Sequence, residues 1–435
     1  MLNKLRLHLN TNFPFLKGKN LFLAVSGGMD SMVLLDLFHQ LDYEIAVLHC
    51  NFSLRDLESD GDEKFLKEYC ENKQISLFIK KFDTNQFAMD AKLSIQVAAR
   101  KLRYDWFYEQ LAEKKFDYLL TAHHLDDSLE TFLINLTRGT GLEGLTGIPV
   151  QNDKIIRPLL PFSRVEIENY IHENNLQWRE DSSNASDKYF RNKVRHAIVP
   201  ILKELNPNLL SSFQNTLKNL QQAQSLLEDA SKLVFQMVVQ EEGNQLKINL
   251  IELMQLPNYA AYLYQWLKDF GFTAWQDIYD LVTAQSGKQV FSDTHALLKD
   301  RDFLILYAKE IHSYKEEYII PKELKEVKVP LNITFSNVSD ISNVNANCIF
   351  VDEDSLQFPL IVRKWQEADY FFPIGMQGKK KLSKYFKDEK MSLIDKSNQW
   401  LLCSKNQVVW VIGKRQDDRY KINDNSINKL QITLQ

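Results

Sequence analysis

The sequence has few cysteines and no pattern that would join them into a cross-link or a metal site. Its four cysteines, Cys50, Cys70, Cys348 and Cys403, are scattered along 435 residues, and none forms a Cys-x-x-Cys pair. This spacing argues against a disulfide scaffold, a zinc ribbon and a cysteine-held iron–sulfur cluster. No apolar run approaches the length of a membrane span, and residues 1–19 do not resemble a signal peptide. We therefore expect a cytoplasmic protein with no membrane partner.

The sequence also lacks a strong excess of either charge. Lys and Arg number 53 and Asp and Glu 57, so the formal net charge is −4, while hydrophobic residues make up 44% and charged residues 25%. This is the composition of an ordinary soluble globular protein. Without an overall basic field, a nucleic-acid partner would have to be held by local basic patches. A chain of 435 residues is too long for one compact core, so we expect several domains.

One stretch near the start of the chain predicts a phosphate-binding loop. The apolar run 21–25 predicts a strand, the apolar run 32–37 predicts a helix, and Ser-Gly-Gly-Met-Asp-Ser joins them. Adjacent glycines let backbone N–H groups approach a ligand, and a helix N-terminus attracts an anion. Neither the common P-loop nor the dinucleotide fingerprint fits the spacing. The candidate nucleotide-binding residues here are Ser26, Gly27, Gly28, Met29, Asp30 and Ser31.

Asp30 is the unusual member of this loop. A carboxylate beside bound phosphates repels them unless a divalent cation lies between, so we expect Asp30 to be a Mg²⁺ ligand and a catalytic residue. The alternative is an ordinary turn in which Asp30 caps the helix.

The residues that follow indicate a doubly wound parallel sheet, because strands and helices alternate. Ligands of such sheets bind at the carboxyl ends of the strands. His49 and Asn51 end the second strand and are candidate nucleotide-binding residues, and Arg100 and Arg103 on a later helix are candidate catalytic residues. We expect strands at 21–25, 44–49, 76–80 and 118–122, and helices at 60–73 and 95–111.

A second polar cluster follows the fourth predicted strand. Asp127 and Glu130 lie three residues apart at the start of a helix, so they share one face and can point at one spot. Two such carboxylates suit Mg²⁺ or the ammonium group of an amine, and the alternative is a solvated acidic helix start. His123 and His124 are possible donors to phosphate, and we take His124 as a candidate nucleotide-binding residue.

Further motifs follow in the same region. A loop at 138–148 holds four glycines, Arg-Pro-Leu-Leu stands at 157–160 and Glu-Asp-Ser-Ser-Asn at 180–184. Arg191 and Arg195 are helical i, i+4 neighbours and form a one-sided basic face. They are candidates for contact with RNA phosphates, and a solvated helix surface is the alternative.

Taken together, these motifs resemble a known family. The loop at 26–31 resembles the pyrophosphate motif of the N-type ATP pyrophosphatase superfamily. With 123–131, 138–148, 157–160, 180–184 and 191–196, roughly the first 200 residues resemble the tRNA(Ile)-lysidine synthetase family in motif order and spacing.

The resemblance implies a two-step ligase reaction. ATP would adenylylate the wobble cytidine of the isoleucine tRNA with anticodon CAU, and free L-lysine would then displace AMP to give lysidine. It further implies ATP and Mg²⁺ as cofactors and a possible homodimer. On this interpretation Arg100 or Arg103 neutralises developing charge, and Asp127 and Glu130 bind the lysine ammonium.

The rest of the chain predicts two more domains. A long amphipathic stretch from 209 to 239 and later apolar segments favour a mostly helical middle domain. From about residue 316 short β-like runs predominate, and the stretch resembles the family's C-terminal domain, which helps to bind tRNA. We expect an α/β fold with a doubly wound catalytic domain (1–205), a helical middle domain (206–315) and a small α+β C-terminal domain (316–435). Candidate tRNA-binding residues in the last are Arg363, Lys379, Lys380 and Lys381, although lysine runs are often merely solvated.

Other interpretations remain open at this point. A tRNA thiolase of the same superfamily would also adenylylate a base, but it typically brings paired cysteines. A non-catalytic nucleotide-binding module would need the loop but not Asp127 and Glu130 on one face.

Overall fold

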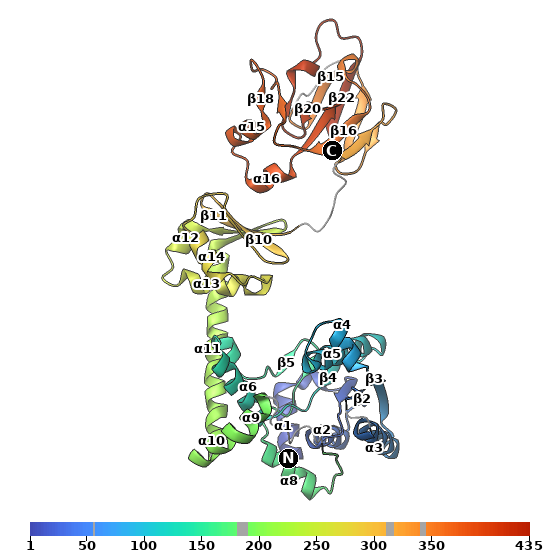
Figure 1. Ribbon diagram of the computed structural model, residues 1–435, viewed down its shortest axis with the longest axis vertical. Coiled ribbons are helices and arrows are strands. Elements are labelled where there is room, and N and C mark those ends of the chain that lie inside the picture. Colours follow the sequence, from blue (N-terminus) through green and yellow to red (C-terminus); the bar gives the residue numbers. More distant parts are fainter. Residues whose placement is uncertain (55–56, 181–189, 310–316, 340–344) are drawn as a thin grey trace. The chain divides into compact units, whose positions relative to one another are not determined.

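The computed structural model describes residues 1–54, 57–180, 190–309, 317–339 and 345–435 (Figure 1). They form two compact units, Met1–Asp229 and Ala230–Gln435. Residues 181–184 of the motif predicted at 180–184 lie outside the described part. The boundary between the units falls inside a long helix, so the three domain ranges expected from the sequence stay predictions.

A six-stranded sheet forms the centre of the first unit. Its order is β3-β2-β1-β4-β6-β5, and all neighbouring strands are parallel except β5 and β6. The strands are β1 (Leu21–Ala24), β2 (Ile45–Asn51), β3 (Ser76–Lys81), β4 (Tyr118–Leu120), β5 (Gln151–Asn152) and β6 (Ile155–Ile156). This confirms the doubly wound parallel sheet.

Helices cover both faces of this sheet. Leu21 and Leu23 of β1 pack into one hydrophobic core, and Phe22 between them packs into the other. The first core includes side chains of α1, α2 and α8, and the second includes side chains of α5. The helical elements of the unit are α1 (Leu2–Asn12), η1 (Pro14–Leu16), α2 (Met29–Gln40), α3 (Leu57–Lys73), α4 (Thr84–Asp90), α5 (Ile95–Glu113), α6 (Leu125–Arg138), α7 (Leu142–Leu145), α8 (Arg164–Glu173), α9 (Phe190–Lys193), the π-helical turn η3 (Val194–Ile198) and α10 (Val199–Leu205).

The strand order positions the site. β1 and β4 are direct neighbours, with Leu21 opposite Tyr118 and Leu23 opposite Leu120. The chain leaves β1 toward β2 on one side and reaches β4 on the other, so the strand order reverses at this point. The loop after β1 and the polar cluster after β4 therefore emerge side by side at the carboxyl edge of the sheet, where such folds bind ligands.

The long helix α11 (Leu209–Val238) confirms the predicted amphipathic stretch and begins in the first unit. Phe213 and Leu217 near its start pack with Leu125 and Leu129 of α6. These contacts fix the helix that carries Asp127 and Glu130.

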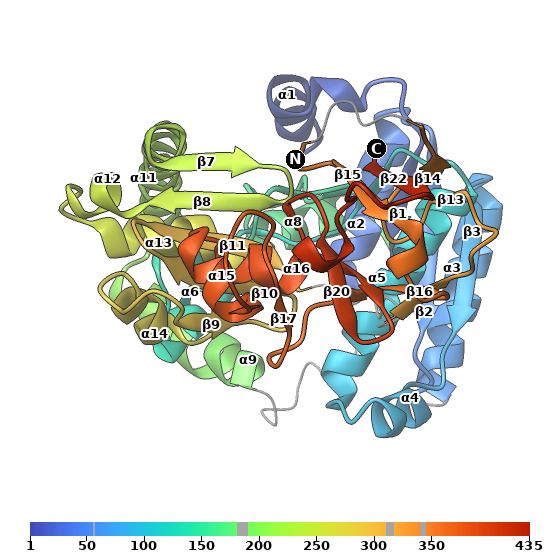
Figure 2. The same ribbon diagram turned by 90° about the horizontal axis from the view of Figure 1, so that it is seen from above.

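The second unit contains a sheet of which only one strand was predicted from the sequence. The predicted helices are present, but five antiparallel strands in the order β7-β8-β11-β10-β9 form a sheet with them, and β7 and β8 lie side by side in Figure 2. Only β11 was expected. The elements are β7 (Val239–Glu242), β8 (Gln245–Asn249), α12 (Leu250–Met254), α13 (Tyr259–Leu267), η4 (Lys268–Phe270), α14 (Trp275–Leu281), β9 (Gln289–Phe291), β10 (His295–Asp300) and β11 (Phe303–Ala308).

Residues 317–435 form an α+β region, as predicted. One sheet has the order β12-β16-β19-β20-β21, another β13-β14-β22-β15, and β17 pairs with β18. Their bounds are β12 (Glu317–Ile320), β13 (Glu326–Val327), β14 (Ile333–Asn337), β15 (Cys348–Asp352), η5 (Glu353–Ser355), β16 (Leu360–Lys364), β17 (Tyr370–Phe371), β18 (Lys380–Lys381), α15 (Leu382–Asp388), α16 (Leu393–Asn398), β19 (Trp400–Ser404), β20 (Gln407–Val411), β21 (Arg415–Gln416), η6 (Asp418–Tyr420) and β22 (Lys429–Leu434).

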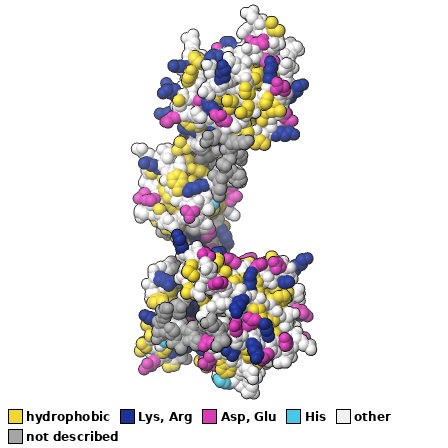
Figure 3. All heavy atoms as spheres, turned by 45° about the vertical axis from the view of Figure 1, so that its right-hand side comes forward, with side chains coloured by type: hydrophobic (Ala, Val, Ile, Leu, Met, Phe, Trp, Pro, Cys, Tyr) yellow, Lys and Arg dark blue, Asp and Glu magenta, His cyan; other side chains and the backbone are white. Residues whose placement is uncertain are grey.

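The surface matches the near-neutral composition. In the view of Figure 3, Lys and Arg side chains are interspersed with Asp and Glu side chains. Among the described residues, no helix combines the length and the apolar character that crossing a bilayer requires.

Candidate functional site

The loop after β1 has the backbone geometry expected of a phosphate cradle. Gly27 has a φ of +92°, which L side chains rarely adopt, so a glycine is needed at this position. The Ser31 hydroxyl donates to Gly28 O at 2.8 Å and accepts from Ser26 N at 3.2 Å, which ties the loop to the first turn of α2. Met29 is the first residue of that helix. The helix therefore directs its N-terminus at the loop.

Asp30 fits the expected role of a cation ligand. Its Oδ1 atom is buried, and within the described residues it has no hydrogen-bond partner. Oδ1 lies 3.7 Å from Nε2 of His124, a residue whose side chain is only 1% exposed. A buried carboxylate oxygen without a donor is suited to a hard cation such as Mg²⁺, which proteins often hold through one or two carboxylates plus substrate phosphates.

The carboxyl end of β2 lines the same edge. His49 is buried, and its Nδ1 lies 2.9 Å from Val25 O, which orients the ring, while its Nε2 is buried and has no partner in the described chain. Burial lowers the pKa of His49, so its ring is neutral at pH 7. The Asn51 amide donates to Asp60 at 3.3 Å and to Glu63 at 3.1 Å. Both residues thus have fixed side chains.

The cluster after β4 lies next to the loop. His124 Nε2 is 3.5 Å from Asp127 Oδ2 and His124 Nδ1 is 3.8 Å from Asp126 Oδ2, in addition to its approach to Asp30. Burial lowers the pKa of His124, but Asp30, Asp127 and Asp126 outweigh it, so the net shift is upward. His123, held by Thr121 at 2.9 Å, is different, because burial lowers its pKa to about 4.

Asp127 and Glu130 converge as predicted, but they face two arginines. Arg191 donates to Asp127 Oδ1 at 2.8 Å and to Glu130 Oε2 at 2.7 Å. Arg195 donates to Glu130 Oε1 at 2.5 Å and Oε2 at 3.1 Å, and to Asp127 Oδ1 at 3.3 Å. The remaining oxygen, Asp127 Oδ2, accepts from His124 N at 3.0 Å. We call these four side chains the Asp-Glu-Arg-Arg cluster.

The surroundings favour the charged forms of Asp127 and Arg195. Burial raises the pKa of Asp127, but His124, Arg191 and His123 outweigh that effect and lower it overall. Burial lowers the pKa of Arg195, but Glu130, Asp127 and Asp30 raise it overall. The side chain of Glu130 is only 3% exposed, whereas those of Arg191 and Arg195 are 41% and 25% exposed. The carboxylates are therefore inside the site and the arginines partly at its surface.

The two arginines of α5 occupy different places. The Arg103 guanidinium lies over the Phe52 ring at 5.1 Å, and its charge lowers the pKa of His49, so it stands near the end of β2. Arg100 lies over the Tyr104 ring of its own helix at 4.8 Å. Both are exposed, and the charge of Arg103 acts on the candidate site residue His49.

Residues 317–435 hold the other candidate tRNA-binding residues. Arg363 is 5% exposed and forms a bidentate pair with Asp369 at 2.8 and 2.7 Å, so its charge is already compensated inside the domain. Lys380 pairs with Asp388 at 2.8 Å. Lys379 and Lys381 are exposed. The two exposed lysines thus differ from Arg363 and Lys380 in being open to an RNA phosphate.

Sequence reasoning missed several residues that hold the site together. Arg179 donates to Asp62 Oδ1 at 2.6 Å and its backbone N–H donates to Gly27 O at 3.0 Å, which links α3 to the phosphate loop. Asp126 accepts from Lys203 at 2.7 Å and from Arg164 N at 2.8 Å. Asp126 lay inside a quoted motif and could have been singled out, whereas nothing in the sequence pairs Arg179 with Asp62.

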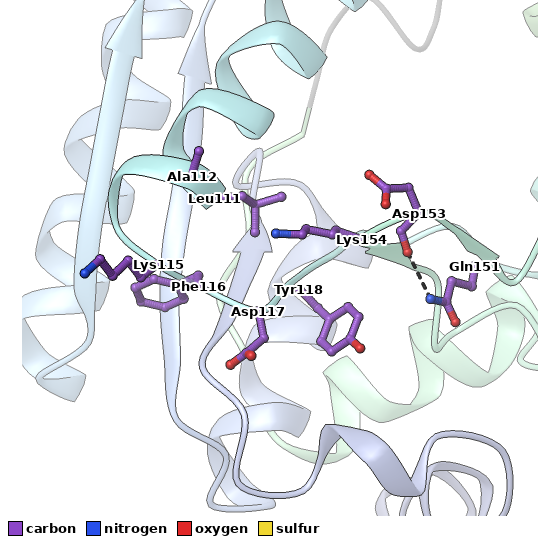
Figure 4. A pocket seen from close by; sticks show the side chains of 9 residues that line it. All are labelled: Leu111, Ala112, Lys115, Phe116, Asp117, Tyr118, Gln151, Asp153 and Lys154. Atoms are coloured by element: carbon purple, nitrogen blue, oxygen red, sulfur yellow. Dashed lines mark hydrogen bonds between the residues drawn. The ribbon is translucent and has the colours of Figure 1, made fainter.

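A surface pocket of about 600 Å³ lies elsewhere in the first unit. Figure 4 shows its lining, which includes Tyr118, Lys115 and Lys154, and the hydrogen bond from Gln151 to the carbonyl oxygen of Asp153. Tyr118 is the first residue of β4, so this pocket is at the amino ends of the parallel strands. It is thus at the edge opposite the phosphate loop and is separate from the candidate site.

All four cysteines are free, and three of them, Cys70, Cys348 and Cys403, are buried. Burial raises the pKa of Cys50 to about 12 and that of Cys70 to about 11, so both are thiols at neutral pH. The described residues contain no group of three or more Cys, His, Asp or Glu side chains that could hold a metal.

Comparison with known proteins finds two family models in this chain and relatives that cover nearly all of it. Residues 2–202 match the PP-loop domain, and residues 241–309 match the TilS substrate binding domain. A tRNA(Ile)-lysidine synthase of Parabacteroides distasonis is 37% identical over 436 residues, which covers 98% of this chain and 98% of the relative. Its counterpart in Bacteroides thetaiotaomicron is 37% identical over 94% of both chains, and that of Bacillus subtilis is 30% identical over 94% of this chain and 92% of its own. The chain therefore belongs to the tRNA(Ile)-lysidine synthase family.

Proposed function

We propose that this protein is an ATP-dependent ligase that forms lysidine at the wobble cytidine of the isoleucine tRNA with anticodon CAU. The observation that carries the proposal is full-length membership of the family combined with a phosphate loop and a carboxylate pair at one edge of the sheet. The proposal includes a cytoplasmic location and leaves a homodimer as a possible assembly.

The phosphate loop supplies the ATP end of the site. Backbone N–H groups of residues 26–31 and the N-terminus of α2 bind the phosphates, and His49 and Asn51 contribute to the nucleotide site from the end of β2. Asp30 holds Mg²⁺, which neutralises phosphate charge when bound. Arg103, near the end of β2, is better placed than Arg100 to compensate charge that develops during adenylylation.

In the first step the cytidine O2 attacks the α-phosphorus of ATP, and pyrophosphate leaves. In the second, the ε-amine of lysine attacks C2 of the activated base, and AMP leaves with the electrons of the C2–O bond. The amine must lose a proton, because its ordinary pKa is about 10.4. A carboxylate of Asp127 or Glu130 beside the ammonium binds it, and one of them accepts that proton.

The Asp-Glu-Arg-Arg cluster gives the lysine step a specific requirement. Every carboxylate oxygen in it already accepts a hydrogen bond, and three of the four accept from an arginine. An incoming ammonium displaces arginine N–H groups from Asp127 or Glu130. The released guanidinium of Arg191 or Arg195 is then available for an anion such as an RNA phosphate. Lysine binding by the carboxylates is therefore coupled to tRNA binding by the arginines.

The direct test is incorporation of labelled lysine into a transcript of the isoleucine tRNA with anticodon CAU, in the presence of ATP and Mg²⁺. A methionine tRNA with the same anticodon is the control. Label in the isoleucine tRNA alone supports the reaction, the substrate and the discrimination together. Formation of AMP and pyrophosphate without incorporation of label would mean that lysine is the wrong nucleophile.

A further inference from the structure

A second polar pocket lies within residues 317–435 and has no role in the reaction just described. Its volume is about 240 Å³, and its lining includes Glu317, Arg363, Gln366, Tyr370, Gln407 and Arg419. The pocket has room for one planar ring system rather than for a helix.

The walls of this pocket are held rigidly. The bidentate pair of Arg363 and Asp369 closes one side, and Gln366 N donates to the same carboxylate at 2.7 Å. Arg419 donates to both oxygens of Asp417, at 3.0 and 2.8 Å, and Asp417 is fully buried. A ligand would thus meet a preformed surface, which lowers the entropic cost of binding.

Flat groups line the pocket. The Arg419 guanidinium lies over the Phe372 ring at 4.6 Å. Tyr370, 43% exposed, presents an aromatic ring. The oxygen of the Gln407 carboxamide accepts from Arg419 at 3.0 Å and from Tyr420 at 3.1 Å, which leaves its amino group as a donor for a ligand. Stacking faces with fixed hydrogen-bonding groups are the features that recognise single bases.

The exposed lysines stand beside the same tyrosine. Strands β17 and β18 pair so that Tyr370 is opposite Lys381, and the Lys379 ammonium lies 5.5 Å from the centre of the Tyr370 ring. Cations next to an aromatic platform are the arrangement that binds the phosphate and base of one unpaired nucleotide.

We propose that this pocket binds a single unpaired nucleotide of the tRNA, an inference that rests on the proposed function. The base stacks on Tyr370, with the Arg419 plane beside it, and its phosphate lies against Lys379 and Lys381. Glu317 accepts a hydrogen bond from an exocyclic amino group, which favours cytosine, adenine or guanine over uracil, since uracil has no such group.

The test uses the full-length protein and measures KM and kcat for lysine incorporation into the isoleucine tRNA. Tyr370→Ala raises the KM for tRNA about tenfold at unchanged kcat, because the stacking platform is lost. Tyr370→Phe retains the ring and stays within about twofold of the wild type. Ile427→Ala, at a side chain that is 86% exposed and does not line the pocket, is the matched control for truncation in the same domain.

Two shortened substrates identify the source of the nucleotide. If it is at the 3′ end, the effect of Tyr370→Ala disappears on a transcript without its unpaired 3′ nucleotides. If it is in the anticodon loop, the effect persists on the isolated anticodon stem-loop. Equal KM values for Tyr370→Ala and Ile427→Ala, or equal losses for Tyr370→Ala and Tyr370→Phe, would overturn the proposal. If the wild type incorporates no lysine, the proposed function fails, and the ratio of tRNA dissociation constants between these variants still tests the pocket.

Discussion

Replacing Glu130 by glutamine tests the Asp-Glu-Arg-Arg cluster directly. The substitution keeps the shape of the side chain and removes its charge, so Asp127 alone remains to compensate Arg191 and Arg195. Breaking a fully buried ion pair by removing one partner costs about 3–5 kcal/mol. The two arginines are 41% and 25% exposed, so solvent screens part of their interaction with the carboxylates. We therefore expect the free energy of unfolding to fall by about 2–3 kcal/mol.

The same substitution affects the two chemical steps unequally. Lysine loses one of the two carboxylates that bind its ammonium, so the KM for lysine rises at least tenfold, a change equivalent to about 1.4 kcal/mol. Formation of pyrophosphate from ATP in the presence of tRNA continues, because the phosphate loop is untouched.

Glu168→Gln is the matched control, because Glu168 also accepts from an arginine, Arg164 at 2.9 Å, but both partners are about 40% exposed. It changes stability by no more than about 1 kcal/mol. The assays are urea denaturation, lysine incorporation at varied lysine and pyrophosphate release. If Glu130→Gln and Glu168→Gln have equal stability and equal KM for lysine, the role of the cluster is refuted.

Three further outcomes follow from the site. Asp30→Asn abolishes pyrophosphate release but changes the free energy of unfolding by less than about 1 kcal/mol, since the buried Oδ1 has no hydrogen-bond partner in the described residues; a large loss of stability by denaturation would contradict this. Burial lowers the pKa of His123 from its ordinary value of 6.5 to about 4. As the pH falls from 6.5 to 4, this histidine is therefore protonated in the unfolded chain but not in the folded one, and the free energy of unfolding falls by about 2–3 kcal/mol. His123→Gln should remove this part of the pH dependence, and an unchanged pH profile would refute it. Lys381→Ala reduces the slope of log affinity for tRNA against log salt by about 1, whereas Lys380→Ala, whose lysine Asp388 already neutralises, reduces it less; equal slopes would argue against the distinction.

The parts of the site that follow strands were predictable from the sequence. Ser26 to Ser31 follow β1, and Asp127 and Glu130 follow β4. Because ligands of such sheets bind at the carboxyl ends of the strands, both groups could be predicted to lie in one site. The partners of the carboxylates were not predicted. Arg191 and Arg195 are about 60 residues away in sequence and were interpreted as RNA contacts. The sequence offered one signal for this pairing, which was helical spacing. The two carboxylates are three residues apart and the two arginines are four apart, so each pair lies on one face of its helix.

After residue 229, two predictions from local sequence were incomplete, one for a side chain and one for a sheet. Arg363 stands in a basic stretch that reads as surface, but Asp369, six residues later, pairs with it in the buried interior. The strands of the middle sheet are short. β8, with the sequence QLKIN, alternates polar and apolar residues as a half-buried strand does, so a period-two signal was present over five residues and was overlooked beside the long amphipathic helix.

The alternation of side chains in β1 also limits how this gene can tolerate insertions. β1 has four residues, its side chains divide between two cores, and the phosphate loop begins two residues after it ends. Inserting one residue into the strand would exchange the two sets of side chains and turn the following loop to the opposite face of the sheet. Insertions of one residue should therefore abolish activity within 21–24 but be tolerated in the exposed turn around Gly18, which lies ahead of the strand.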